Sequence, residues 1–309
     1  MDDMVATTNL DDPELGTLRR LETEALTIGY FAVGRGPLVV LLHGFPYDVR
    51  AYAEVAHLLA DASCRVVVPF LRGYGPTRYA DARTVRSAEQ AALASDVLDL
   101  VDASGADTAV VAGFDWGARA ACAFAALWPD RCAGVVSVGG NQIHDLARAA
   151  HPVAPRAEAA LWYQYYFLTE RGRRGLARHR RELTRQLWSD WSPTWRFTDA
   201  EFARTAASFD NPDWVDTVVH SYRYRHGVAA GDPRYAALAQ RLARTPAIRV
   251  PALDVVGAAG TAAPVGRGAD LGADSSTRVI AGAGHNLPQE RPREFARAVL
   301  ELVRRVHAR

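Results

Sequence analysis

Short, uninterrupted apolar runs alternate along this chain with segments of helical periodicity, and this alternation constrains the fold most. The runs at residues 38–42, 65–68, 108–112 and 134–138 are typical of strands buried on both faces of a parallel sheet. Helical patterns lie between them at residues 51–60, 87–101 and 118–127. Strands that alternate with helices in this way predict an α/β protein with a parallel sheet.

The pattern changes after residue 140 and returns near residue 247. Residues 141–246 are rich in Arg, Trp and Tyr at helical spacing and contain almost no strand-like run. Strand character resumes at residues 251–256 and 277–280, and residues 291–307 predict a closing helix. We therefore predict a core domain of residues 1–140 and 247–309, interrupted by a helical cap domain of residues 141–246.

Composition excludes several classes of protein. The chain has 309 residues, of which 49% are hydrophobic and 23% charged, as in ordinary globular proteins. No apolar run approaches the roughly 18 residues that span a bilayer, and the acidic start lacks the pattern of a signal peptide. The three cysteines form no CxxC pair, which disfavours a disulfide scaffold. We expect a cytoplasmic protein without a membrane partner.

The net charge and the spacing of the histidines limit the classes of ligand that we expect. The formal net charge is +1, and the seven arginines within residues 171–185 are interpreted as a solvated helix face, so no nucleic-acid partner is expected. The nine histidines lack HxH or HExxH spacing, and no glycine-rich phosphate loop follows a strand. We expect no metal, no cofactor and a small-molecule substrate, and a homodimer is left open.

One pentapeptide carries the strongest chemical signal. Gly113-Phe-Asp115-Trp-Gly117 lies between a short apolar run and a helix of small residues. Glycines on both sides suit the sharp strand-to-helix turn of a nucleophile elbow, where the nearby backbone leaves no room for side chains. A carboxylate in that position attacks carbon and forms an ester with the enzyme. The competing interpretation is that Asp115 only caps the following helix.

Two further segments favour the catalytic interpretation. His43-Gly-Phe-Pro46 follows a buried strand, where such sheets build an oxyanion hole from backbone N–H groups. Gly282-Ala-Gly-His285 follows the last strand, where the order of nucleophile, acid and histidine places the base.

Together these motifs resemble the α/β-hydrolase superfamily, and specifically its Asp-nucleophile branch of epoxide hydrolases and haloalkane dehalogenases. The resemblance covers the chain from about Thr27 onward. It implies an α/β-hydrolase fold, with a mostly parallel sheet flanked by helices and an inserted helical cap. It also implies that Asp115 is the nucleophile, that His285 is the base, and that the N–H groups of Phe45 and Trp116 form the oxyanion hole.

The cap segment favours the epoxide hydrolases within this branch. Those enzymes use two cap tyrosines to protonate the oxirane oxygen, the first commonly before Gln and the second before Arg. Tyr163-Gln164 and Tyr222-Arg223 resemble these two sites. Tyr166 and Tyr224 compete with them for these two sites, and together with Trp162 they are candidates for substrate binding. The competing interpretation is that all of these rings only pack cap helices.

The dehalogenases fit less completely. Haloalkane dehalogenases pair the Trp after the nucleophile with an Asn in the oxyanion loop, but Phe45 occupies that position beside Trp116. Fluoroacetate dehalogenases carry two arginines after the nucleophile, and only the second, Arg119, is present.

One departure from the family pattern concerns the acid that orients the base. Gly260 stands where the resemblance implies that acid, an Asp. Asn141 and Asp145, after the preceding strand, are possible substitutes, whereas Asp254 lies within a predicted strand. Loss of the acid would slow hydrolysis of the ester, because His285 acts only in that step.

The prediction is thus an epoxide hydrolase for a bulky apolar or aromatic substrate, with a role in secondary metabolism. The alternatives are C–halogen hydrolysis and a degenerate member of the family that binds its ligand without turnover.

Overall fold

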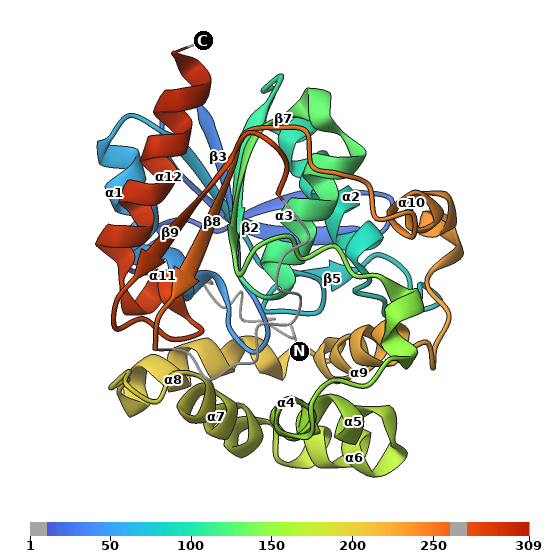
Figure 1. Ribbon diagram of the computed structural model, residues 1–309. Helices are drawn as coiled ribbons and strands as arrows, with labels where there is room; N and C mark the ends of the chain where they lie inside the picture. The colour runs from blue at the N-terminus through green and yellow to red at the C-terminus, as the bar shows by residue number, and fades with distance from the viewer. Residues whose placement is uncertain (1–10, 260–270, 309) are drawn as a thin grey trace, which may run out of the picture.

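A single sheet organises the chain. The computed structural model describes residues 11–259 and 271–308, and the strands of these residues join in the order β1-β2-β4-β3-β6-β7-β8-β9, with β5 also paired to β2 (Figure 1). Consecutive pairs from β4 to β9 are parallel. The predicted α/β fold with a mostly parallel sheet is confirmed.

The parallel strands are the apolar runs of the sequence. Their bounds are β3 Leu38–Leu42, β4 Arg65–Pro69, β6 Ala109–Gly113, β7 Cys132–Val138, β8 Ala252–Gly257 and β9 Ser275–Ile280. Every residue of β3 and β6 is buried, because helices cover both faces of the sheet.

One edge of the sheet is antiparallel. β2 (Leu26–Gly34) pairs antiparallel with β4, with β1 (Arg19–Glu22) and with β5 (Arg78–Tyr79). The loose alternation of residues 25–33 predicts β2, whereas the sequence pattern predicts neither of its smaller partners.

Helices form a layer on each side of the sheet (Figure 1). On one side α1 (Ala53–Asp61) packs against α12 (Pro292–His307), and on the other α2 (Gln90–Ala103) packs against α3 (Trp116–Leu127). Two short helices, η1 (Val49–Tyr52) and α11 (Leu287–Glu290), lie close to each other, and η2 (Pro129–Arg131) precedes β7.

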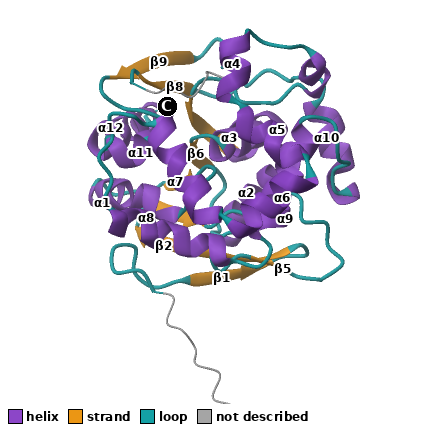
Figure 2. Cartoon of the chain, turned by 90° about the horizontal axis from the view of Figure 1, so that it is seen from below, coloured by secondary structure: helices purple, strands orange, loops and turns teal. Residues whose placement is uncertain are grey.

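The segment between β7 and β8 is helical. Its elements are η3 Leu146–Ala150, α4 Pro155–Ala160, α5 Trp162–Leu168, α6 Glu170–Arg178, α7 Arg180–Trp191, α8 Asp199–Ala206, η4 Ala207–Asp210, α9 Trp214–Arg225, η5 Pro233–Tyr235 and α10 Ala236–Leu242. Helices α4 to α9 lie together beyond one end of the sheet, and a view from that side shows α5 to α9 in front of the strands (Figures 1 and 2). α10 instead contacts α2 and α3. The exact division into core and cap stays a prediction.

No helix within residues 11–259 and 271–308 is long and apolar enough to cross a membrane. The same residues contain no cluster of His, Cys, Asp or Glu side chains suited to a metal ion.

Candidate active site

Asp115 occupies a strained turn between β6 and α3. Its backbone has φ 51° and ψ −118°, in a region that non-glycine residues avoid. A Cβ at Gly113 would lie 2.3 Å from the Gly117 carbonyl, and one at Gly117 would lie 1.9 Å from the Leu42 carbonyl oxygen. Both glycines are therefore required for the turn that presents Asp115.

The loop after β3 reaches the same carboxylate. The Phe45 backbone N–H donates a 2.9 Å hydrogen bond to Oδ1 of Asp115, and a Cβ at Gly44 would lie 2.5 Å from the Cβ of Asp115. Trp116 is the first residue of α3, where backbone N–H groups lack partners inside the helix. The Phe45 N–H thus contacts the carboxylate directly, and Trp116 follows Asp115 at the start of the helix.

His43 stabilises the loop after β3 through two hydrogen bonds. Its Nε2 accepts a 3.0 Å hydrogen bond from the Leu71 N–H, and its Nδ1 lies 3.1 Å from the Gly44 carbonyl oxygen. Because Nε2 accepts, the ring is neutral and Nδ1 is the donor. Burial lowers the pKa of His43 to about 4, which keeps the ring in this form at neutral pH.

His285 faces Asp115 from the loop after β9. Its Nε2 lies 3.8 Å from Oδ2 of Asp115, which is longer than a hydrogen bond. Burial lowers the pKa of His285, against the opposing effect of the Asp115 charge, and Arg119 lowers it further. The imidazole is therefore neutral and able to accept a proton at neutral pH.

Tyr163 on α5 and Tyr222 on α9 pack against the loop of Phe45. Their ring centroids are 5.5 Å apart at an interplanar angle of 88°, and both rings contact Phe45. Burial raises the pKa of both phenols, and the charge of Asp115 adds to the increase. Both hydroxyls are thus protonated and can donate.

The sequence profile of the alpha/beta hydrolase fold matches residues 37–292. The chain belongs to the alpha/beta hydrolase fold family. The parallel strands of the sheet and the Asp115 turn lie within the matched residues.

Individual relatives of this α/β hydrolase are epoxide hydrolases by name. A "putative epoxide hydrolase" of Klebsiella pneumoniae has a crystal structure with 41% identity and a TM-score of 0.89, covering 94% of this chain and 98% of that one. Epoxide hydrolase B of Mycobacterium tuberculosis is 37% identical over 45% of this chain, and the match spans only 42% of that relative. Epoxide hydrolase A of the same species is 28% identical over 93% of this chain and 97% of its own length. The chain is therefore similar to epoxide hydrolases along its whole length.

A buried carboxylate that the sequence did not single out holds the loop of Gly284 and His285. Oε1 of Glu290 accepts a 2.7 Å hydrogen bond from the Ser192 hydroxyl, and Oε2 accepts one of 2.6 Å from the Gly284 N–H. The Ser192 oxygen in turn accepts a 2.9 Å hydrogen bond from the backbone N–H of His285. Ser192 follows α7, so the inserted segment helps to fix the backbone of His285.

The candidates for the acid beside His285 have other partners. Oδ1 of Asn141 accepts from the Ile143 N–H and Oδ1 of Asp145 from the Ala147 N–H, both at 3.0 Å. Oδ1 of Asp254 accepts a 2.7 Å bond from Gly140. Gly260 lies outside the described residues. Within the described part of the chain, neither Asn141 nor any carboxylate forms a hydrogen bond with Nδ1 of His285.

Gln164 and His226 orient Tyr163. The Gln164 amide nitrogen donates a 2.9 Å hydrogen bond to the Tyr163 hydroxyl oxygen, and its Oε1 lies 3.0 Å from Nε2 of His226. Because the Tyr163 oxygen already accepts from Gln164, its own proton is free to be donated. The Tyr-Gln dipeptide was the sequence signal for this arrangement, but His226 had none.

The other aromatic candidates lie outside the Tyr163–Tyr222 contact. The hydroxyl of Tyr166 points at Gly175, whose added Cβ would lie 1.9 Å from it. Tyr224 stacks on His220, with ring centroids 6.2 Å apart. Trp162 is 38% exposed and lines a cavity of about 550 Å³ together with Trp191. Trp191 also packs edge-on against His285, with centroids 4.8 Å apart.

Proposed function

We propose that this α/β hydrolase is an epoxide hydrolase that works through an ester on Asp115. One observation carries the proposal: the Tyr163 oxygen accepts a hydrogen bond from Gln164, which leaves the Tyr163 proton free beside the protonated Tyr222. Two such donors next to a carboxylate suit a reaction that opens a strained C–O bond and protonates its oxygen.

The two oxygens of Asp115 have different roles in this proposal. Oδ1 is held by the Phe45 N–H, so it becomes the ester carbonyl. Oδ2, on the side of His285, attacks an oxirane carbon. The ring C–O bond breaks as the new bond forms, and Tyr163 or Tyr222 gives its proton to the ring oxygen.

His285 acts in the second step. Its Nε2 takes a proton from a water molecule, whose oxygen attacks the ester carbonyl, and the N–H groups of Phe45 and Trp116 stabilise the oxyanion. The acyl C–O bond then breaks, and the imidazolium protonates the departing alcohol. The second proton of the water, released as the Asp115 carboxylate re-forms, returns to the tyrosinate, and the product is a diol.

A single-turnover reaction in ¹⁸O-water tests the order of these bonds. With protein in excess over styrene oxide, the label is expected in the peptide that carries Asp115 and not in the first diol formed. Asp115→Asn is expected to form neither adduct nor diol. Label in the first diol would contradict the ester mechanism, because it would mean that water attacks the oxirane directly.

The intact mass of the protein separates the proposal from a degenerate relative. An adduct that accumulates without diol would mean that the first step is intact and that the missing acid has slowed the second. Ligand binding that survives Asp115→Asn, with no adduct or diol in the native protein, would favour a non-catalytic binder.

C–halogen hydrolysis is a second candidate because of Trp116. Its indole Nε1 is buried and has no hydrogen-bond partner within the described residues, and a halide ion would accept from it. Chloride release from a chloroalkane or a chloroacid, faster than diol formation from any epoxide, would favour this alternative.

A further inference from the structure

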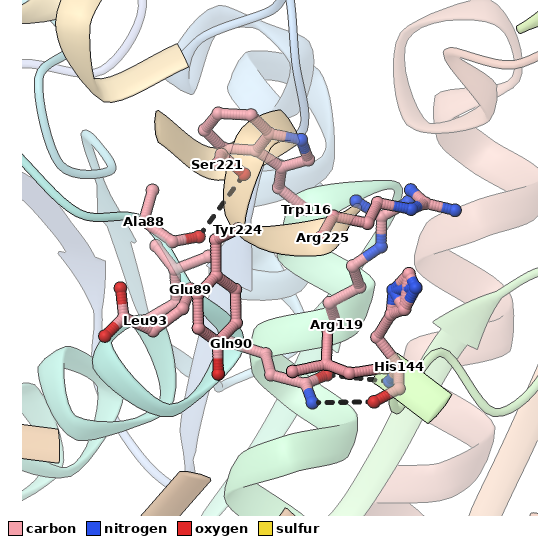
Figure 3. Close-up of a pocket in the computed structure, with 11 residues that line it drawn as sticks. Ala88, Glu89, Gln90, Leu93, Trp116, Arg119, His144, Ser221, Tyr224 and Arg225 are labelled. Atoms are coloured by element: carbon pink, nitrogen blue, oxygen red, sulfur yellow. Dashed lines mark hydrogen bonds between the residues drawn. The ribbon is translucent and has the colours of Figure 1, made fainter. Parts of the chain in front are cut away.

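A second pocket lies beside the proposed reaction site, and basic side chains gather at one end of it. Figure 3 shows the nitrogen-bearing ends of Arg119, Arg225 and His144 together. Trp116 lines the same pocket, so the pocket adjoins the residue that follows the nucleophile. Its volume of about 30 Å³ accommodates one or two water-sized groups.

Arg225 is buried without an ion pair among the described residues. It is 8% exposed, its Nη1 has no hydrogen-bond partner, and it forms no ion pair within the described residues. Arg72 shows how this protein buries a structural arginine: Nε and Nη2 bind the Asp96 carboxylate at 2.6 and 2.7 Å. An unpaired buried charge is costly, so Arg225 is placed to meet an anion that the described residues do not provide.

Arg119 increases the local positive charge. It lies one turn after Asp115 on α3, and it too forms no ion pair within the described residues. Burial, followed by the charge of Arg119, lowers the pKa of Arg225 to about 10, so Arg225 stays charged at neutral pH. Burial and the two arginines lower the pKa of His144 to about 2, which makes it a neutral hydrogen-bonding group.

Glu89 does not neutralise the arginines. Its carboxylate lies at the other end of the pocket (Figure 3), where Oε1 accepts a 2.8 Å hydrogen bond from the Asp232 N–H. Gln90 holds the backbone of His144 through two hydrogen bonds of 2.8 and 3.2 Å, which fixes that residue at the arginine end.

We propose that Arg119 and Arg225 bind the carboxylate of an acidic substrate, so that the enzyme acts on epoxides that carry a carboxylate group. The inference rests on the proposed epoxide hydrolase function. A carboxylate matches the planar guanidinium groups, and its small size matches the volume of the pocket.

The pocket adjoins the segment of the nucleophile, because its lining residues Trp116 and Arg119 follow Asp115 within the first turns of α3. Arg119 contributes to lowering the pKa of His285, and the Asp115 charge acts on Arg225. A carboxylate held here would keep a nearby oxirane against Asp115 and beneath Tyr222, whose ring lies 5.8 Å from that of Trp116.

A pair of substrates that differ only in charge tests the proposal. The kcat/KM for 3-phenyloxirane-2-carboxylate is expected to exceed that for its carboxamide by about 100-fold, the effect of one or two charge-assisted hydrogen bonds. Arg119→Gln and Arg225→Gln should each reduce this ratio at least tenfold. Arg223→Gln, on the same helix but outside the pocket, should leave it unchanged. A ratio near one in the native protein, or one that survives both substitutions, would overturn the proposal.

Thermal unfolding supplies a readout that does not need turnover. Phenylacetate, which has the carboxylate but no oxirane, should raise the Tm of the native protein and not that of Arg225→Gln. Without ligand, Arg225→Gln should unfold at the same or a higher temperature than the native protein, whereas Arg72→Gln should unfold several degrees lower.

Failure of the proposed function and failure of the carboxylate site remain distinguishable. Suppose that neither epoxide gives diol or adduct, but that phenylacetate still stabilises only proteins that retain Arg225. The carboxylate site would then be supported, and the epoxide hydrolase function would be contradicted. An equal increase in Tm with phenylacetamide or sodium chloride, or no increase at all, would overturn the carboxylate site.

Discussion

The two sides of the proposed site are built in different ways. The floor, formed by the turn of Asp115 and the loop of Phe45, is fixed largely by the backbone: glycines without room for a Cβ, a positive φ and a hydrogen bond from the Phe45 N–H to the Asp115 carboxylate. The wall, formed by α5 and α9, presents Tyr163, Tyr222 and Arg225 through side chains.

This difference suggests that the two sides determine different properties, the type of reaction and the choice of substrate. The floor leaves little freedom for substitution, because its contacts are between backbone atoms at close to minimum distance. The wall consists of helices whose exposed faces can change without breaking the sheet. We therefore expect the floor to determine that an ester forms, and the wall to determine which substrate forms it.

The largest effect is expected when both donors of the wall are removed. Tyr163→Phe and Tyr222→Phe should each slow formation of the Asp115 ester by about 10- to 100-fold, and the double variant by about 10⁴-fold, since general acids contribute up to that much. Pre-steady-state adduct formation measures the step.

The Tm of the Tyr222→Phe variant shows whether a loss of activity comes from the missing hydroxyl or from a damaged fold. The Tyr222 hydroxyl has no hydrogen-bond partner within the described residues, so Tyr222→Phe should leave the Tm unchanged. A double variant that still forms the adduct at the native rate would show that the wall does not supply the proton.

The floor should respond through stability. Gly117→Ala places a Cβ 1.9 Å from the Leu42 carbonyl oxygen, so the strand and the helix must separate, at a cost of about 3 kcal/mol or more. Gly105→Ala is the matched control, because Gly105 has φ +67° but nothing within 4 Å. It should lose only about 1–2 kcal/mol from backbone strain. Equal losses in urea unfolding would mean that the close approach is not what fixes the floor.

The sequence was sufficient for the floor because its determinants are local. Gly113 and Gly117 flank Asp115 in one pentapeptide, and buried strands such as β3 and β6 are continuous apolar runs. The edge strand β1 was missed because it is mostly exposed and contains Arg19 and Arg20 in place of an apolar pattern.

The sequence was insufficient for partners that only folding brings together. Ser192 and Glu290 lie far apart in the chain, and nothing in one sequence distinguishes Glu290 from other carboxylates. Arg225 sits within a polar, aromatic helix segment, where its burial could not be seen. The aromatic candidates near Tyr163 and Tyr222 share their helices, and only the packing separates Tyr166 and Tyr224 from them.

Acid should weaken the floor through His43. His43 has a pKa lowered to about 4 in the folded protein and an ordinary value near 6.5 when unfolded. Between these values the unfolded chain binds the extra proton, so the free energy of unfolding falls as pH falls from about 6.5 to 4. The loss is on the order of 3 kcal/mol.

Urea unfolding at several pH values measures this dependence. His43→Gln retains a neutral donor and acceptor but cannot titrate, so its stability should fall less steeply over the same range. Parallel slopes for the two proteins would contradict a buried neutral His43.

The smallest effect joins the two sides, because Ser192 comes from the inserted segment while His285 and Glu290 come from the sheet side. Glu290→Gln replaces one acceptor oxygen by an amide, so it can no longer accept from both the Ser192 hydroxyl and the Gly284 N–H. We expect the His285 loop to loosen and ester hydrolysis to slow by about 10- to 100-fold, as for other supports of a reacting group. Adduct formation should keep its native rate, since Asp115 and the tyrosines are untouched, and the adduct should therefore accumulate in the steady state. Glu301→Gln, the same change at an exposed position of α12, is the control and should leave both steps unchanged. If Glu290→Gln slowed ester formation and ester hydrolysis equally, the carboxylate would support the site as a whole. The contributions of the floor and the wall could then not be separated at His285.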